Sequence, residues 1–289
     1  MEKKLKILSK RVNFYLNNYL SKFNSSELIA PMKYGLFPGG KKIRSKIIFD
    51  VGKIFNVKKK SLLILAASVE AIHAYSLIHD DLPCMDDDKL RRGKPSTHIK
   101  YGESTAILAG NSLLTTAFEI LSDKNFKIDY KIKPKLINLL SRCSGQTGIA
   151  GGQYLDLSYE KKKVSLNKIL NMELKKTGKL FEFCCVAPIL INKNKNNIKS
   201  FSRIGKDIGL LFQIVDDMID FKGATKLAGK ITKKDIKKGK ATIISLLGYE
   251  NAVKYTNKLK QNIYNKLKSY NYKANDLRET INFIMERNK

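Results

Sequence analysis

The chain has 289 residues, and its 55 Lys and Arg outnumber its 26 Asp and Glu, which gives a formal net charge of +29 at pH 7. Its four Cys contain no Cys-x2-Cys pair, so neither a zinc site nor a disulfide framework is indicated. The first residues lack the apolar region of a secretory signal, and no stretch approaches the roughly 18 uninterrupted apolar residues of a membrane span. We therefore expect a cytoplasmic protein without stable membrane insertion.

The positive charge itself has two interpretations. A basic chain can bind nucleic acid or an anionic membrane surface. Eight of the 55 basic residues are Arg, however, and the Lys are spread along the chain among Asn and Ile. The codons of an AT-rich genome produce this enrichment, so we favour that explanation and expect no nucleic-acid partner. A basic nucleic-acid or membrane binder is the alternative.

Helical patterns dominate the chain. Pro is limited to six residues, strand signals are few, and no Pro/Gly/Ser-rich linker divides the sequence. We therefore expect an all-α protein in which residues 1–289 form a single domain. Long amphipathic or apolar segments predict helices at residues 60–79, 104–122, 134–149, 165–190 and 240–268.

The first motif along the chain is the Gly pair Gly39–Gly40, which precedes a predicted helix. Lys41 and Arg44 are three residues apart and are predicted to share a face of this helix, where they can cradle phosphate oxygens. The Gly-x4-Gly-Lys-Ser/Thr spacing of a P-loop is absent, and an ordinary turn and helix start is the alternative. The inward positions of the helix are predicted at Ile43, Ile47 and Val51.

An acidic cluster follows the apolar stretch 62–79, which contains neither Pro nor Gly and predicts a buried helix. Pro83 interrupts this helix, and the break lets Asp86 fold back toward Asp80. Clustered carboxylates repel one another unless a cation neutralises them, and hard oxygen ligands favour Mg²⁺ over zinc or copper. An acidic helix end or a solvated turn is the alternative. The cluster consists of Asp80, Asp81, Asp86, Asp87 and Asp88.

Two arginines, Arg91 and Arg92, come directly after this cluster. Adjacent guanidiniums offer bidentate donors to phosphate oxygens in a way that Lys does not match. Arg is rare in this chain, so the pair is informative. The alternative is that the two arginines are counter-charges for the neighbouring Asp residues.

A second acidic cluster lies in residues 207–221, whose apolar groups have helical spacing. Asp216 and Asp220 are predicted on one helix face, with Gln213 beside them and Asp217 adjacent in sequence. Because Mg²⁺ is commonly held by one or two carboxylates together with substrate phosphates, two such clusters predict a phosphorylated substrate held between them.

These motifs, with residues 73–79, 151–156 and 176–178, resemble in their order the motifs of the short-chain trans-prenyltransferases of the polyprenyl synthase family. Among them the chain is most similar to the bacterial farnesyl diphosphate synthases. The resemblance runs from about residue 30 to residue 289. It implies the isoprenoid synthase fold, an all-α single-domain helical bundle around a central cavity, in which two Asp-rich helices face each other. Homodimers are usual in this family.

The resemblance also implies roles for individual residues. The Mg²⁺ ligands would be Asp80, Asp86 and Asp216, supported by Asp81, Asp87, Asp217 and Asp220. The catalytic groups, which with Arg91 hold the allylic substrate, would be Lys176, Thr177, Gln213 and Lys230. Isopentenyl diphosphate would be held by Lys41, Arg44, His73 and Arg92. Three Mg²⁺ per active site are implied, with Mn²⁺ as a substitute.

The implied reaction is a Mg²⁺-dependent head-to-tail condensation. Isopentenyl diphosphate would react with dimethylallyl and then geranyl diphosphate to give (2E,6E)-farnesyl diphosphate, through ionisation, condensation and elimination. Synthesis of geranyl or geranylgeranyl diphosphate by the same family is an alternative. A non-catalytic partner subunit is another, although both acidic clusters are present.

Product length is expected to depend on Tyr75 and the adjacent Ser76. Tyr75 lies five residues before Asp80, or roughly 7 to 8 Å along a helix axis, which is a sensible depth for a floor under the growing chain. A bulky ring there favours a C15 product, and simple core packing is the alternative.

The chain also departs from the family pattern. Lys42 and Ser45 stand where the family commonly has Arg and Pro. The positions at 223–224 and 228–235, in an expected lid-like loop around Lys230, are changed as well.

Overall fold

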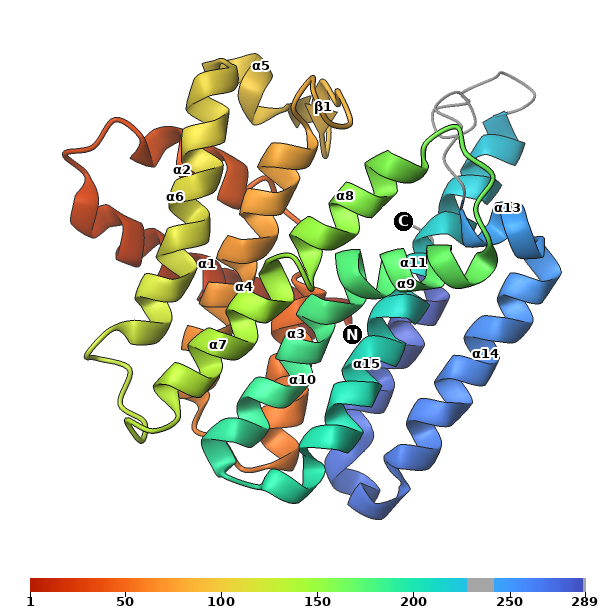
Figure 1. Ribbon diagram of the computed structural model, residues 1–289. Helices are drawn as coiled ribbons and strands as arrows, with labels where there is room; N and C mark the ends of the chain where they lie inside the picture. Colours follow the sequence, from red (N-terminus) through yellow and green to blue (C-terminus); the bar gives the residue numbers. More distant parts are fainter. Residues whose placement is uncertain (228–241, 288–289) are drawn as a thin grey trace. The chain divides into compact units, whose positions relative to one another are not determined.

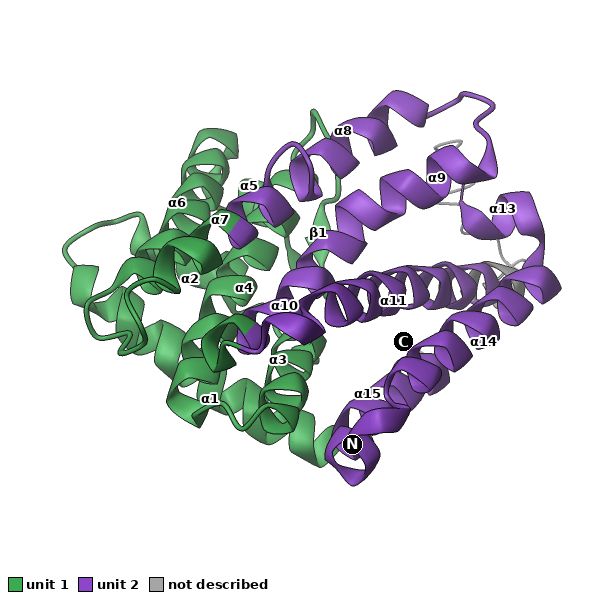
Figure 2. Cartoon of the chain, turned by 60° about the horizontal axis from the view of Figure 1, so that its bottom comes forward, with its two compact units in different colours: residues 1–138, 190–193 green, residues 139–189, 194–289 purple. Residues whose placement is uncertain are grey.

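The computed structural model describes residues 1–227 and 242–287, and these residues are almost entirely helical (Figure 1). The strands in this part of the chain are β1 (Leu90–Arg91) and β2 (Lys94–Pro95), which pair antiparallel in a short hairpin. The predicted all-α class is therefore confirmed. The chain divides into two compact units: unit 1 contains residues 1–138 and 190–193, and unit 2 contains residues 139–189 and 194–289 (Figure 2). The single domain expected from the sequence stays a prediction.

Unit 1 is organised around α4 (Lys59–Asp80), which packs against four other helices of the unit. Its side chains are apolar on nearly every face, so it must be surrounded to remove them from water. By length and composition α4 could also span a membrane, but 83% of its most apolar 18-residue window is buried inside the structure, as in a globular core helix. The helices that pack against α4 are α1 (Glu2–Leu20), α2 (Ile29–Leu36), α3 (Ile43–Ile54) and α6 (Glu103–Ser122).

The other helical segments of unit 1 are short. They are η1 (Ser21–Phe23) and α5 (Thr97–Tyr101). Helix α7 (Lys133–Ser144) begins in unit 1 and ends in residues assigned to unit 2.

Unit 2 is organised around α11 (Ile198–Leu227), which carries the second acidic cluster. It packs against the later helices α13 (Ile243–Leu247), α14 (Tyr249–Lys266) and α15 (Asn275–Glu286). It also packs against η2 (Leu174–Gly178), a π-helical turn. The remaining segments are α8 (Ile149–Tyr159), α9 (Leu166–Glu173), η3 (Lys195–Asn197) and η4 (Lys268–Ala274). Helix α10 (Lys179–Asn192) begins in unit 2 and ends in residues assigned to unit 1.

The predicted helices at 60–79 and 104–122 correspond to α4 and α6, and both are confirmed. The prediction at 134–149 was wrong at its C-terminal end, because α7 stops at Ser144. A Cβ on Gly148 would lie 1.9 Å from the carbonyl oxygen of Cys143, so the chain turns too tightly there for a helix to continue. The prediction of one helix at 240–268 was wrong, because Gly248 with φ +77° separates α13 from α14.

Glycines also set the spacing between α10 and α11. A Cβ on Gly205 would lie 2.6 Å from the backbone oxygen of Phe181 and 2.7 Å from the Cα of Glu182. Backbone atoms cannot rotate away as a side chain can. The close approach of the two helices therefore depends on the missing side chain at this position.

We expect Gly205→Ala to lower the free energy of unfolding by about 1–3 kcal/mol, because the added methyl group forces α10 and α11 apart. Urea denaturation followed by circular dichroism measures the change. Gly178→Ala is the matched control, since its Cβ would find its nearest neighbour at 3.6 Å, an ordinary contact. Equal destabilisation by the two substitutions would contradict this account of the packing.

Candidate functional site

The first acidic cluster forms a turn that closes on the end of α4. The backbone N–H of Asp86 donates to the carbonyl oxygen of Asp80 at 2.9 Å, and that of Asp88 donates to Asp81 at 3.2 Å. Helix α4 ends at Asp80, and Pro83 lies within the turn. The predicted break and the return of Asp86 toward Asp80 are therefore confirmed. Asp80 and Asp86 are half-buried, and they come from the two ends of this turn.

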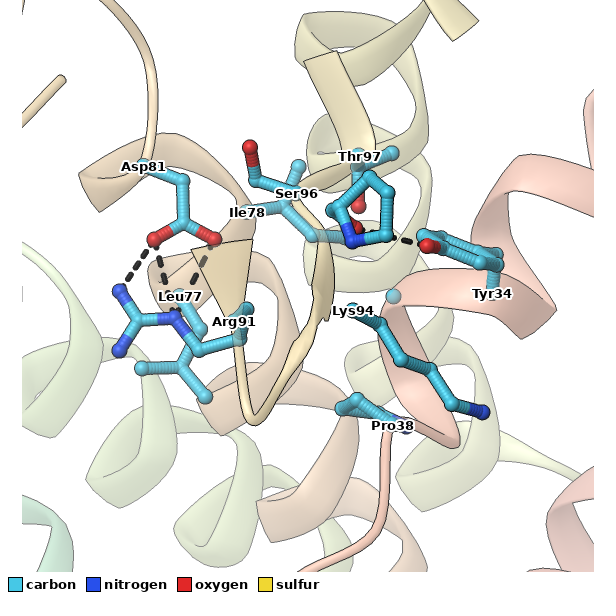
Figure 3. Close-up of a pocket in the computed structure, with 11 residues that line it drawn as sticks. Tyr34, Pro38, Leu77, Ile78, Asp81, Arg91, Lys94, Ser96 and Thr97 are labelled. Atoms are coloured by element: carbon cyan, nitrogen blue, oxygen red, sulfur yellow. Dashed lines mark hydrogen bonds and ion pairs between the residues drawn. The ribbon is translucent and has the colours of Figure 1, made fainter. Parts of the chain in front are cut away.

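Asp81, in contrast, is buried and forms an ion pair with Arg91 (Figure 3). The Nε of Arg91 donates to Asp81 Oδ1 at 2.9 Å, and its Nη2 donates to the same carboxylate. Burial raises the pKa of Asp81, and the guanidinium opposes that effect. Asp88 lies 3.6 Å from Arg91 as well. This pairing fits the alternative interpretation of Arg91 as a counter-charge for the acidic cluster, and a role of Arg91 toward a substrate stays a prediction.

Arg92 belongs to a different group of side chains. Its backbone has φ 53°, in the left-handed region, and its guanidinium lies over Gly40, where a Cβ would approach Arg92 Nη1 to 2.1 Å. A side chain at position 40 would therefore displace Arg92. Arg44 Nη1 lies 3.3 Å from His73 Nε2. The predicted residues Arg44, His73 and Arg92 are thus gathered in unit 1, in what we call the basic cluster.

The prediction that Lys41 and Arg44 share a helix face was wrong. Helix α3 begins at Ile43, so Lys41 precedes it and is exposed. The helix cannot extend back to Lys41, because Lys42 has φ 51° and ψ 44°, in the left-handed region. The inward positions are confirmed, since Ile43, Ile47 and Val51 are buried.

Lys42 and Glu70 contribute to the basic cluster, and the sequence had not marked them as functional. Lys42 Nζ lies 3.1 Å from Glu70 Oε2, and both side chains are buried. Burial opposes ionisation of Glu70, but Lys42, Ser45 and Arg44 outweigh it, so the pKa of Glu70 lies below its usual value. A lone Glu in an apolar helix was the available signal.

His73 is held in its neutral form. Burial lowers its pKa well below the usual value, and the positive charges of Arg44, Arg92 and Lys42 lower it further. A neutral imidazole next to a guanidinium can accept a hydrogen bond from it. The basic cluster therefore combines permanent cations with an uncharged ring.

Lys176 and Thr177 lie in the π-helical turn η2 of unit 2. Such turns occur frequently at functional sites. Lys176 Nζ donates to Asp156 Oδ2 at 2.6 Å, and a Cβ on Gly152 would lie 2.2 Å from the backbone nitrogen of Lys176. Glycine at position 152 thus lets α8 approach η2 closely. Asp156 was missed as a site residue, although the motif at 151–156 contained it.

Gln213 links Thr177 to the second acidic cluster. The hydroxyl of Thr177 donates to Gln213 Oε1 at 3.1 Å, and Gln213 Nε2 donates to Asp217 Oδ1 at 3.0 Å. The sequence placed Gln213 beside Asp216 and Asp220, whereas its amide donates to Asp217. Burial, together with Asp216 and Asp220, raises the pKa of Asp217 to about 7.

Arg287 also contacts this cluster, and the sequence had not indicated it. Its Nη2 lies 2.8 Å from Asp216 Oδ1 and donates to the carbonyl oxygen of Phe212 at 2.7 Å. The guanidinium carbon lies 3.7 Å from the centre of the Phe212 ring. The rarity of Arg in the chain was the one available signal.

Both acidic clusters have the donor chemistry that Mg²⁺ prefers, because their side chains supply carboxylate oxygens. Among the described residues, no group of three or more His, Cys, Asp or Glu side chains is placed to hold a metal ion. Asp87 is exposed and Asp220 lies on the same helix as Asp216. Lys230 lies outside the described residues.

Tyr75 lies within α4, five residues before Asp80, and no break separates the two. Its ring is buried and meets the His79 ring edge to face, with the centroids 5.7 Å apart. Burial raises the pKa of Tyr75 to about 12, so the phenol stays neutral. Ser76 donates to the carbonyl oxygen of His73 at 3.0 Å, which occupies its hydroxyl within the helix.

Comparison with known proteins gives a consistent result. Residues 25–281 match the family model described as polyprenyl synthetase. The chain is 38% identical over 292 residues to the farnesyl diphosphate synthase of Micrococcus luteus, with both chains fully covered. It is 35% identical to the geranylgeranyl diphosphate synthase of Cyanophora paradoxa, over 94% of this chain and 92% of that protein.

Solved structures agree with these relatives. An FPP/GFPP synthase from Zymomonas mobilis superimposes with a TM-score of 0.86 at 34% identity, covering 98% of this chain and 100% of that one. A geranyltransferase from Helicobacter pylori, complexed with magnesium and isoprenyl diphosphate, gives 0.80 at 29% identity, covering 98% and 96%. These similarities support the expected isoprenoid synthase fold.

The lowered pKa of His73 predicts a pH effect on stability. An unfolded His has a pKa of about 6.5, so below that pH the unfolded chain takes up a proton that folded His73 resists. This contribution to stability is full above about pH 6.5 and is lost as the pH falls toward the folded pKa. The free energy of unfolding should therefore drop less between about pH 7.5 and about pH 5.5 in His73→Gln than in the native chain, as measured with urea. Identical drops would contradict the prediction.

Proposed function

This chain belongs to the polyprenyl synthetase family, and we propose that it condenses isopentenyl diphosphate with dimethylallyl and then geranyl diphosphate to make farnesyl diphosphate. The observation that carries the proposal is the divergence of two adjacent arginines. Arg91 binds Asp81 of the acidic cluster, while Arg92 lies over Gly40 in the basic cluster. This divergence supports one diphosphate site with carboxylates for metal and another built of cations, both in unit 1, as a reaction between two diphosphates needs.

The carboxylates assigned to Mg²⁺ are Asp80, Asp86 and Asp216, with Asp81, Asp87, Asp217 and Asp220 in support. When bound, Mg²⁺ would neutralise charge on the departing diphosphate. Arg91 and Lys176 supply further positive charge to the allylic diphosphate, and we assign Lys230 the same task.

Ionisation of the allylic substrate breaks its C1–O bond, and both electrons leave with the diphosphate. The hydroxyl of Thr177 donates its proton to Gln213, so its lone pairs are available to stabilise the carbocation. The double bond of isopentenyl diphosphate then forms the new C–C bond, and a proton leaves from the adjacent carbon to the released diphosphate. No side-chain nucleophile is required, and water must be excluded because it would quench the cation.

The basic cluster is assigned to isopentenyl diphosphate. Arg44 and Arg92 supply permanent charge, and neutral His73 keeps Arg44 in place at 3.3 Å. Lys41 is exposed before α3, and we assign it to the same diphosphate. The carboxylate of Glu70 in this cluster is already paired with Lys42 and Ser45. Binding by the cations alone suits a substrate whose C–O bond must stay intact.

Similarity to bacterial farnesyl diphosphate synthases supports the finer parts of the proposal. These are three Mg²⁺ per active site with Mn²⁺ as a substitute, a homodimer, and action in the cytoplasm without nucleic acid or stable membrane insertion. Because the chain is also similar to the geranylgeranyl diphosphate synthase of Cyanophora paradoxa, synthesis of a longer product is the second candidate. The buried ring of Tyr75 favours the shorter C15 product.

Removal of a metal-binding carboxylate should abolish the reaction. With Mg²⁺, isopentenyl and dimethylallyl diphosphates, the native protein should release a C15 product, and Asp80→Ala or Asp216→Ala should lower kcat by roughly 100-fold or more. Asp207→Ala is the matched control on α11, because Asp207 pairs with Lys266 outside the cluster; its kcat should stay within about twofold. Native protein that condenses nothing with any divalent metal would overturn the proposed function.

Product length tests Tyr75. Shortening this side chain removes the floor five residues below Asp80, so Tyr75→Ala should make products longer than C15, measured by mass spectrometry. Tyr75→Phe keeps the ring and should keep the C15 product. An unchanged C15 product from Tyr75→Ala would reject Tyr75 as the limit of chain length.

A further inference from the structure

The basic cluster encloses a buried carboxylate with no assigned role. Glu70 lies on α4 with its side chain 3% exposed. The hydroxyl of Ser45 donates to its Oε1 at 2.6 Å, and Lys42 Nζ lies 3.1 Å from its Oε2. Each carboxylate oxygen therefore has its own partner. Burying a charge is strongly unfavourable without such partners, so the three residues form one unit.

The partners of Glu70 stand on either side of Arg44 in the sequence. Lys42 precedes α3 and Ser45 lies in its first turn, so Glu70 ties down the backbone both before and after Arg44. These are also two of the positions at which this chain departs from the usual family residues, and both side chains contact the same carboxylate.

The ion pair also offsets a strained backbone. Lys42 adopts φ 51° and ψ 44°, a conformation that residues with a Cβ rarely adopt. This conformation directs the chain into α3 with Ile43 inward, and Arg44 then meets His73 one turn after Glu70 on α4. Glu70 and His73 therefore contact the start of α3 from the same face of α4.

Charge gives Glu70 a second effect. Arg44 lowers the pKa of Glu70, and for Arg92 burial lowers the pKa of the guanidinium while Glu70 opposes that effect. The negative charge of Glu70 therefore opposes the positive charges of both arginines. One carboxylate against Lys42, Arg44 and Arg92 still leaves two positive charges for an anionic ligand.

We propose that Glu70 is a positioning residue for isopentenyl diphosphate, which holds Lys42 and the first turn of α3 so that Arg44 and Arg92 are set for the diphosphate before it binds. The inference rests on the proposed function, because that function assigns Arg44 and Arg92 to isopentenyl diphosphate. A positioned pair of guanidiniums spares the ligand the cost of ordering them.

The test uses Glu70→Gln in the full chain, with the affinity for isopentenyl diphosphate measured by calorimetry without an allylic substrate. Glutamine keeps an acceptor for Ser45 but loses the ion pair with Lys42. We expect Kd to rise roughly 10- to 100-fold, the size of a lost charged hydrogen bond. In turnover assays KM for isopentenyl diphosphate should rise by a similar factor, while KM for dimethylallyl diphosphate stays within about twofold.

A buried ion pair elsewhere on α3 provides the matched control. Lys46 and Asp50 are paired four residues apart, with side chains 7% and 3% exposed, the same values as for Lys42 and Glu70. Asp50→Asn should lower stability without changing Kd for isopentenyl diphosphate. If Glu70→Gln fails to fold, Ser45→Ala provides a second test, because this substitution removes a single hydrogen bond to Glu70. Ser45→Ala should raise Kd for isopentenyl diphosphate roughly 3- to 10-fold. Glu70→Asp keeps the charge and should restore part of the affinity.

The outcomes separate the two proposals. If the native chain condenses its substrates but Glu70→Gln or Ser45→Ala leaves Kd unchanged, or weakens both substrates equally, Glu70 has a structural role alone and the inference is wrong. Native protein that binds isopentenyl diphosphate but forms no product overturns the proposed function. In that case, weaker binding by Glu70→Gln still supports the positioning role.

Discussion

The pairing of Arg91 with Asp81 is the interaction on which the arrangement of unit 1 depends (Figure 3). It joins the hairpin formed by β1 and β2 to the end of α4. With Arg91 held by Asp81, the left-handed backbone conformation of Arg92 directs the Arg92 side chain toward Gly40. Loss of Arg91 would leave the buried carboxylate of Asp81 without its counter-charge, which is destabilising. A single ion pair thus separates a carboxylate site from a cationic site.

In unit 2 a π-helical turn, rather than an ion pair, directs two neighbouring side chains to different partners. The π-helical turn η2 places Lys176 and Thr177 on consecutive residues, yet their side chains bond to different helices, α8 and α11. Close approach at Gly152 leaves no room for a side chain between α8 and η2, and close approach at Gly205 leaves none between α10 and α11. Small residues therefore allow the close packing, and polar bonds orient the groups within it.

Residues near the start of α3 and in the C-terminal part of the chain limit what could be predicted from the sequence. The Gly pair and the following cations indicated phosphate binding, but helix periodicity could not reveal that Lys42 would adopt a left-handed conformation and pair with Glu70, 28 positions later. Arg287 lies 71 positions after Asp216, and no local pattern connects them. Gly248 broke a predicted helix, because a periodic apolar pattern continues across a single left-handed residue.

The sequence by itself determined the all-α class, the family resemblance, and the return of Asp86 toward Asp80. Each of these depends on neighbouring residues: apolar spacing, ordered motifs, and a Pro three positions after the last helical residue. The tertiary structure alone decided which charges meet. Arg91 with Asp81, Lys42 with Glu70, and Lys176 with Asp156 are chosen by packing, because a long cationic side chain can reach several carboxylates and the positions of the helices select one.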